Sequence, residues 1–175
     1  MTSVLKEKYL YEKYSARLLA VCRRYVGDKD VAEDVLHDSF ITIFKNLDTV
    51  DFRGEEKLYG WMRRIAVNRC IDWLRNRKRA PVPLDEDGDI PDEGGGEPEG
   101  VRKIPPAVLF RMIEELPEGY RTIFNLFCLD GYSHAEIAGM LGIKEKTSSS
   151  QYFRARTLLA QKIKNYLADG EDKQQ

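Results

Sequence analysis

Residues 80–106 divide the chain into two parts. They contain six of the seven prolines, the triplet Gly94-Gly95-Gly96, and eight acidic against two basic side chains. Proline interrupts helices and strands, and a polar, acidic segment cannot bury enough apolar surface to order itself. We therefore expect a flexible acidic linker at residues 81–106, between a domain at residues 1–80 and a second domain at residues 107–168, with a polar, frayed tail at residues 169–175.

Apolar residues recur at helical spacing on both sides of this linker, whereas the alternation typical of strands is almost absent. The predicted fold class is all-α, with two small helical domains. We expect helices at residues 3–26, 28–47, 55–79, 106–116, 118–129, 133–141 and 146–168.

The net charge of the chain, −1, conceals opposite local charges. Residues 1–80 carry 17 basic and 12 acidic side chains, the linker carries an excess of six acids, and residues 107–175 carry nine of each sign. A near-neutral chain would by itself argue against nucleic-acid binding. Because opposite charges are concentrated in different segments, the net charge of the whole chain does not exclude nucleic-acid binding.

The composition also indicates a compartment and a class of chemistry. The longest apolar run, residues 18–22, is far shorter than the roughly 20 residues that span a bilayer, so we expect a cytoplasmic protein without membrane insertion. Cys22, Cys70 and Cys128 lie in apolar helical patterns and are expected to be buried and reduced. Neither a metal nor a cofactor is expected, and no phosphate loop or nucleophile–base pair predicts an enzyme with catalytic residues or a small-molecule substrate.

The second predicted helix has two distinct faces. One is an apolar stripe, predicted to be buried, of Ala32, Leu36, Phe40, Ile43 and Leu47. The opposite face carries Asp34, Asp38, Ile41 and Lys45, with His37 beside them. This face is either an ordinary solvated surface or a docking surface for a basic partner, since complementary charge steers association.

The third predicted helix is strongly basic, with seven basic residues and one acid between residues 60 and 80. Its spacing places Arg64, Asn68, Asp72 and Arg75 on one face, with Trp61 at the start. Arginines neutralise phosphates, an amide can read a base edge, and an aromatic ring can stack on an unpaired base. The alternative is a solvated helix in which Asp72 pairs with Arg75 or Arg69 and Trp61 belongs to the core.

A helix-turn-helix is predicted near the C-terminus. Ser133 and Glu136 have the spacing of a capping box, and Gly142 allows a tight turn before the next helix. In that helix we expect inward packing of Tyr152, Ala155, Leu159, Ile163 and Tyr166, and an outward face of Ser149, Ser150, Phe153, Arg154 and Thr157. Such a helix can enter the major groove of DNA, where Arg154 could bind a guanine edge, although a bare helical hairpin would share the pattern. His134 is expected to be a first-turn surface residue.

Five segments together resemble the extracytoplasmic-function (ECF) sigma factors. VAEDVLHDSF at residues 31–40 and GWMRRIAVNRCIDWLR at residues 60–75 resemble the first domain of that family. LPEGYR at residues 116–121, GYSHAEIA at residues 131–138 and FRARTLL at residues 153–159 resemble its second domain. The order of the segments, with a linker between the two groups, makes the resemblance specific.

The resemblance implies a bacterial initiation factor that binds core RNA polymerase, directs it to promoter DNA and is held inactive by an anti-sigma factor. Asp34, His37, Asp38 and Ile41 would dock on the clamp helices of the largest polymerase subunit. The segment from about residue 52 to residue 75 would bind the −10 element, with Asn68 and Asp72 on the reading helix and Trp61 at its start, beside Arg64 and Arg75. Ser149, Ser150, Phe153 and Arg154 would meet the −35 element, with Lys146 and Arg156 at phosphates. The competing hypothesis is a regulator that binds duplex DNA alone through its helix-turn-helix.

Three residues depart from the family pattern. His37 replaces a frequent glutamine in the docking helix. Ser148 replaces a buried valine beside Tyr152 and should weaken packing unless its hydroxyl bonds back to the preceding turn. Gln151 replaces a frequent arginine, which predicts fewer charges facing the −35 DNA.

Overall fold

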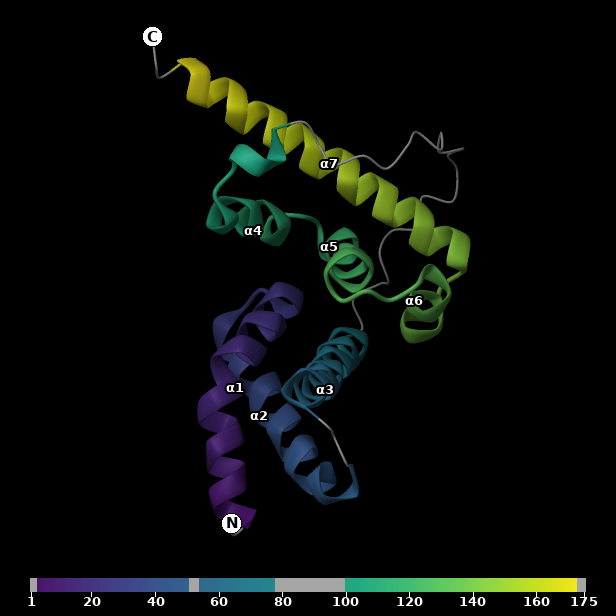
Figure 1. Cartoon of the computed structure of the whole chain (residues 1–175). Helices are drawn as coiled ribbons and strands as arrows, with labels where there is room; N and C mark the ends of the chain where they lie inside the picture. The colour runs from purple at the N-terminus through teal and green to yellow at the C-terminus, as the bar shows by residue number, and fades with distance from the viewer. Residues whose placement is uncertain (1–2, 51–53, 78–99, 173–175) are drawn as a thin grey trace. The chain divides into compact units, whose positions relative to one another are not determined.

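The structure is a computed structural model that describes residues 3–50, 54–77 and 100–172 (Figure 1). The described residues form helices and turns without any strand, as the predicted fold class requires. They divide into two compact units, residues 1–79 and residues 80–175. Each unit is described separately below.

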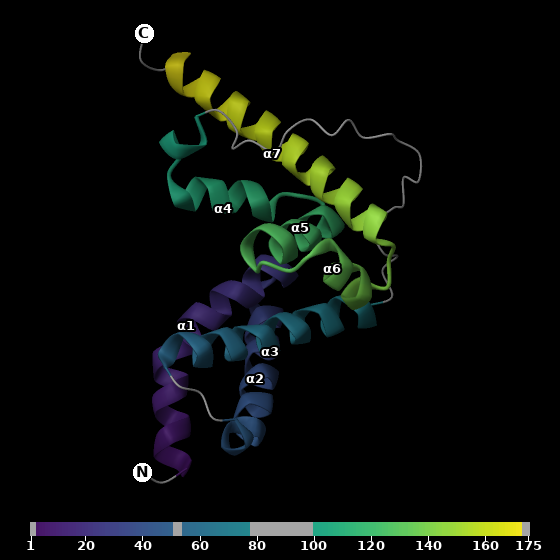
Figure 2. The ribbon, with the colours of Figure 1, turned by 45° about the vertical axis from the view of Figure 1, so that its right-hand side comes forward.

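The described residues of the first unit form three α-helices: α1 (Ser3–Val26), α2 (Lys29–Asn46) and α3 (Glu55–Asn76). Each of the three packs on the other two, and Figure 2 shows α3 crossing the pair formed by α1 and α2. Gly27, at φ 74°, ends α1, and the Asp28 side chain accepts a hydrogen bond of 3.0 Å from the backbone N–H of Val31. This N-cap satisfies one of the free N–H groups at the start of α2, so a two-residue connection suffices between the two helices.

The core of the first unit confirms the apolar stripe predicted for α2. Ala32, Leu36, Phe40, Ile43 and Leu47 are all buried. In α3 the buried residues include Val67 and Ile71, whereas Ile65 and Trp73 are half-buried. The helix ends at Asn76, three residues earlier than predicted.

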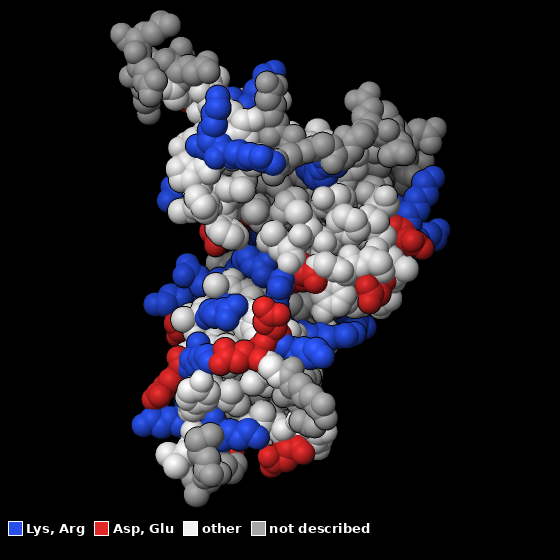
Figure 3. Space-filling model, in the orientation of Figure 1, with Lys and Arg blue, Asp and Glu red and all other residues white. Residues whose placement is uncertain are grey.

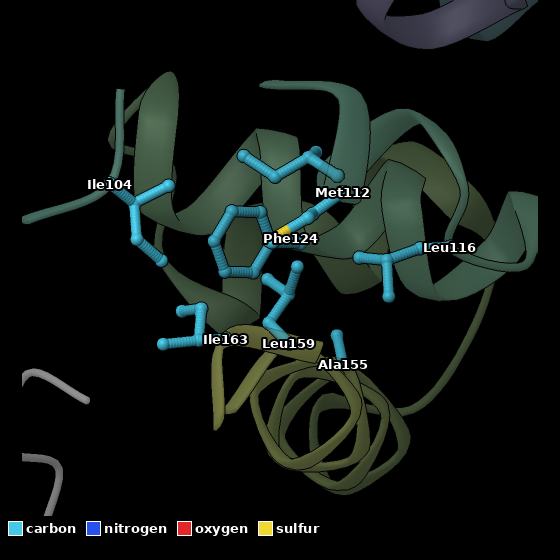
Figure 4. Close-up of a cluster of buried hydrophobic side chains, with 8 residues drawn as sticks. Ile104, Met112, Leu116, Phe124, Ala155, Leu159 and Ile163 are labelled. Atoms are coloured by element: carbon cyan, nitrogen blue, oxygen red, sulfur yellow. The ribbon is translucent and has the colours of Figure 1, made fainter. Parts of the chain in front are cut away.

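Among the residues of the second unit that the structure describes, there are four α-helices: α4 (Pro106–Glu114), α5 (Glu118–Phe124), α6 (His134–Leu141) and α7 (Glu145–Asp172). A π-helical turn, Asn125–Leu129, follows α5 directly. The three shorter helices pack on α7, which runs along one side of the unit (Figure 1). Figure 4 shows the apolar cluster between α4, α5 and α7, which contains Ile104, Met112, Ile113, Leu116, Phe124, Ala155, Leu159 and Ile163.

The predicted linker, residues 81–106, extends too far at its C-terminal end, because its last residues belong to the second unit. Val101–Lys103 forms a 3-10 turn, and Ile104 is buried in the core of the second unit. Gly100 adopts φ 79°, and a Cβ atom at this position would lie 2.6 Å from Leu167 Cδ1. Residues 100–106 are therefore fixed to α4 and α7, because Val101 and Ile104 supply apolar surface that the composition of the whole segment obscures. Residues 78–99 lie outside the described residues.

The end of α7 also differs from the prediction. The helix continues to Asp172, so residues 169–172 of the expected tail are helical. Tyr166, expected to pack inward, is exposed, and Leu167 packs against the core instead. The reason is helical spacing, since residue 167 lies four positions after the buried Ile163 and above it on the same face.

Two of the three cysteines are buried as predicted, and the third is not. Cys22 and Cys70 are buried as predicted, but Cys128 is exposed. It lies in the π-helical turn, in which the Asp130 N–H donates a hydrogen bond of 2.9 Å to the Asn125 carbonyl. The wider turn shifts the following side chains around the axis, so the ordinary helical period placed Cys128 on the wrong face.

Candidate protein- and nucleic-acid-binding surfaces

The predicted docking residues of α2 form one exposed surface, which we call the α2 face: Asp34, His37, Asp38 and Ile41. Ile41 is 52% exposed although it is a large aliphatic side chain. Asp38 comes just under one turn before Ile41 in α2 and Asp34 about two turns before it, so both carboxylates lie on its N-terminal side. An exposed apolar residue with acidic neighbours is suited to a protein interface, because the apolar centre supplies affinity and the charges steer encounter.

An aromatic ladder lies beside the α2 face. The rings of Tyr11 and Phe40 are 4.8 Å apart between centroids, and those of Phe40 and Phe44 are 5.4 Å apart. Tyr11 comes from α1, so the ladder fixes α2 against α1. The α2 face is consequently presented by a rigid helix pair.

Four predicted DNA-binding residues form a second exposed surface, the α3 face: Arg64, Asn68, Asp72 and Arg75. Trp61, at the start of this surface, is half-buried. The predicted helix register is therefore confirmed, and the four side chains are accessible together. Residues 51–53 and 78–79, which flank α3 in the sequence, lie outside the described residues.

Arg69 links the α3 face to α2. Its guanidinium lies 3.9 Å from the Asp72 carboxylate and donates a hydrogen bond of 2.8 Å to the Thr42 hydroxyl. Of the two partners expected for Asp72, the structure therefore selects Arg69. The pair is solvent-exposed and adds little stability, but it directs the Asp72 carboxylate along the helix.

The start of α3 is fixed to α1 by contacts that sequence analysis missed. The Lys13 ammonium donates hydrogen bonds to the Glu55 carboxylate and, over 3.0 Å, to the Tyr9 hydroxyl. One turn further along, the Arg17 guanidinium lies 3.8 Å from the centroid of the Tyr59 ring. The hydrogen bond to Glu55, and next the one to Tyr9, raise the pKa of Lys13. The only sequence signal is the four-residue spacing of Tyr9, Lys13 and Arg17.

The predicted helix-turn-helix is present in the second unit. The Ser133 hydroxyl accepts a hydrogen bond of 3.2 Å from the Glu136 N–H, and the Glu136 carboxylate accepts one of 2.8 Å from the Ser133 N–H. This capping box begins α6, and Gly142, at φ 67°, ends it. Helix α7 begins three residues later, at Glu145.

The predicted DNA-facing residues of α7 are less exposed than expected. Lys146 and Ser149 are exposed, whereas Ser150, Phe153, Arg154 and Arg156 are half-buried. The exposed phenylalanine expected at position 153 is therefore partly covered. All six residues still lie off the buried stripe of Ala155, Leu159 and Ile163.

One prediction about this helix is wrong, and the structure shows which group the Ser148 hydroxyl contacts. Gln151 is buried, so it does not face DNA and its exchange for arginine does not reduce the outward charge. Ser148 is buried as expected, but its hydroxyl lies 2.9 Å from His134 Nδ1 and does not bond to the preceding turn. His134 is accordingly half-buried between the two helices.

The charges of the two units differ in their distribution (Figure 3). On the visible face of the first unit, basic and acidic side chains alternate, whereas the visible face of the second unit has a broad uncharged area with charges at its edges. Among the described residues, no group of three or more His, Cys, Asp or Glu side chains could hold a metal ion. No helix among them combines the length and apolarity required to cross a bilayer.

Sequence comparisons give the class of the protein. Residues 10–80 match the family Sigma-70 region 2, and residues 107–159 match the family Sigma-70, region 4. The first match contains both the α2 face and the α3 face, and the second contains the helix-turn-helix. Together they define a sigma factor of the sigma-70 type.

Individual relatives narrow the class. The chain is 35% identical over 164 residues to the ECF RNA polymerase sigma-E factor of Salmonella typhimurium, which covers 88% of this chain and 84% of the relative. It is 34% identical to the sigma-E factor of Escherichia coli over the same shares of the two chains. The chain belongs to the ECF sigma factors, and it is a transcription initiation factor that directs RNA polymerase to promoters.

A solved structure shares the fold. The sigma factor RpoE of Bartonella quintana, crystallised with the anti-sigma factor NepR, aligns with a TM-score of 0.51 and 22% sequence identity. The alignment covers 90% of this chain and 96% of that chain. At this identity the likeness supports the helical architecture alone.

Proposed function

We propose that two helix faces of the first domain have separate roles. The α2 face would dock on the clamp helices of core RNA polymerase, and the α3 face would bind promoter DNA. The observation that supports the docking role is the exposure of Ile41 on the same face as Asp34 and Asp38, on a helix whose opposite side is buried. A basic surface on the polymerase would be steered by the carboxylates, and Ile41 would supply apolar contact. His37, which is also exposed on this face, would belong to the same contact.

The α3 face would bind the −10 element as a separated strand. Arg64 and Arg75 would neutralise phosphates, Asn68 would contact a base edge, and Trp61 would stack on an unpaired base, a contact worth about 1–3 kcal/mol. Asp72, directed by Arg69, would accept a hydrogen bond from a base amino group. Binding the unpaired strand in this way would assist promoter melting.

Helix α7 would bind the −35 element in the major groove. Ser149, Ser150, Phe153 and Arg154 would contact base edges, and Lys146 and Arg156 would contact phosphates. The half-buried state of Phe153 and Arg154 favours this role, because side chains with restricted motion lose less entropy on binding.

The protein would act in the cytoplasm as a binding protein without chemistry of its own, and an anti-sigma factor would regulate it. The Bartonella relative was crystallised with such a partner. A partner that covered the α2 face would compete directly with polymerase for Ile41 and its acidic neighbours.

The test is reconstitution of the full chain with core RNA polymerase on a promoter pool randomised in the −10 and −35 elements. We expect transcripts from a restricted set of sequences in which both elements are enriched. The chain alone should bind the same duplexes weakly, because a domain of zero net charge makes few phosphate contacts. Initiation without enrichment of either element would exclude the proposed DNA-binding surfaces.

A further inference from the structure

A polar pair of one buried and one half-buried side chain joins the two helices of the helix-turn-helix. Ser148 is completely buried in the first turn of α7, and its hydroxyl lies 2.9 Å from Nδ1 of His134 in α6. The His134 ring stacks on Phe127 with 4.2 Å between centroids and 6° between planes. Tyr152, one turn after Ser148, tilts against Phe127 at 4.5 Å. The four side chains close a ring that includes the π-helical turn, α6 and α7.

Each end of the polar pair is fixed by the backbone. His134 is the first residue of α6 and directly follows the N-cap residue, Ser133, which forms the capping box with Glu136. The Ser148 N–H donates a hydrogen bond of 3.1 Å to the Lys144 carbonyl, so Ser148 lies within the first closed turn of α7. The bond between the two side chains therefore connects the starts of the two helices.

This hydrogen bond restrains rotation of the first turn of α7, which apolar packing restrains only weakly. Helices α6 and α7 pack on each other, and Ile137 of α6 is buried, but dispersion between apolar side chains depends weakly on direction. A hydrogen bond is directional and weakens steeply when it bends. Ser149 and Ser150 follow Ser148 immediately, so a small rotation of the first turn would displace both. Binding groups have to be held within about 0.5 Å and 10–20° to act.

The state of the imidazole is compatible with this role. Burial lowers the pKa of His134, and the opposing effect of the Glu145 carboxylate is smaller. The ring is consequently neutral at neutral pH, and a serine hydroxyl can donate to or accept from Nδ1 according to the tautomer.

We propose that His134 and Ser148 are positioning residues that set the rotation of the first turn of α7 and thereby the base preference of Ser149 and Ser150. The inference rests on the proposed −35 function of α7. It also explains why a buried hydroxyl is tolerated among apolar side chains: its desolvation is offset by a bond with a function.

The test uses the full chain with core RNA polymerase and a promoter pool randomised over the −35 element, with the −10 sequence fixed to one that the wild-type holoenzyme selects. A Ser149→Ala/Ser150→Ala variant first identifies the base pairs that the first turn discriminates. Ser148→Ala then removes the hydroxyl, and His134→Phe/Ser148→Ala replaces both partners by apolar groups and preserves the ring stack. Because exchange of both partners can be nearly neutral for stability, the double variant tests the inference even if Ser148→Ala folds poorly.

We expect both variants to lose about fivefold in preference at those base pairs, the factor for one neutral hydrogen bond. Preference at other −35 positions and transcription from the best sequence should change less. His134→Asn, which retains a polar group near the Nδ1 position, should preserve the preference. Thr157→Val is the matched control, since it removes a hydroxyl of the same helix that bonds only to the Phe153 carbonyl.

Several results would overturn the inference. One is an unchanged base preference in the double variant, and another is a uniform loss of transcription without a change in preference, which would indicate a purely structural role. Loss of the base preference in His134→Asn would mean that the stack of His134 on Phe127, and not the bond to Ser148, positions the first turn of α7. If the wild-type holoenzyme enriches no −35 sequence, the proposed function of α7 fails as well, so the two failures are distinguishable.

Discussion

The two domains present their binding side chains in opposite ways. In the first domain the side chains of the α2 face and the α3 face are exposed and carry different charge, one face being acidic and the other mainly basic. In the second domain most of the α7 side chains that we propose to bind DNA are half-buried, and residues 107–175 have no net charge. The first domain can therefore rely on charge to attract its partners, whereas the second depends on the placement of a few side chains.

The largest expected effect tests whether the two domains are stable independently. Met62 is fully buried in the first domain, and Met62→Ala should lower the unfolding free energy of that domain by about 3 kcal/mol. Both tryptophans, Trp61 and Trp73, lie in α3, so tryptophan fluorescence reports the first domain and helical circular dichroism reports both. The fluorescence transition should move to lower temperature while a second transition stays in place. Equal shifts of the two would mean that the domains unfold as one.

Arg154→Ala tests the reliance of the second domain on individual contacts. We expect a loss of about 2 kcal/mol in discrimination between a selected promoter and its −35 mutant, the range for a specific base contact. Competition between the two promoters in one transcription reaction measures the ratio, with Lys164→Ala, an exposed residue of the same helix, as the control. Equal discrimination by wild type and Arg154→Ala would remove Arg154 from the −35 surface.

Two separate glycine substitutions test where the second domain begins. Gly100→Ala places a Cβ at φ 79°, close to Leu167, and should destabilise the second domain by about 1.5 kcal/mol. Gly139→Ala in α6 meets open space and should be neutral or stabilising. Thermal unfolding followed by circular dichroism measures both. If Gly100→Ala has no effect, residues 100–104 do not belong to the folded domain.

The smallest effect concerns pH. The lowered pKa of His134 means that the unfolded state binds more protons just below the ordinary value of 6.5, so the stability of the second domain should fall as pH drops through that value. Glu145, which faces the ring from α7, opposes the shift without reversing it. Thermal unfolding between about pH 7.5 and about pH 5.5 should show this slope in the wild type and a weaker one in His134→Phe. The same slope in both proteins would contradict the assignment.

Features that depend on one helix were predictable from sequence. The buried stripe of α2 and the capping box of Ser133 and Glu136 follow from spacings of three or four residues, which the helical period converts directly into a face or a cap. The register of the α3 face was predictable for the same reason, since Arg64, Asn68 and Arg75 are all exposed.

Features that depend on contacts between elements were not predictable. Lys13 and Glu55 are 42 positions apart, and no local pattern indicates that they meet. The π-helical turn changes the period for five residues and exposes Cys128. The partner of Ser148, His134, lies on another helix, so the residue pattern of α7 alone does not indicate their contact.

The central claim is that polymerase docking and DNA binding lie on separate faces of the first domain. The most direct test is the affinity of core RNA polymerase for Asp38→Arg, with Glu12→Arg, the same charge change at an exposed position of α1, as the control. We expect Asp38→Arg to weaken binding roughly thirtyfold through like-charge repulsion without loss of fold, and Glu12→Arg to leave the affinity unchanged. Asn68→Ala should bind core normally and alter only the −10 preference. Wild-type affinity in Asp38→Arg would contradict the account.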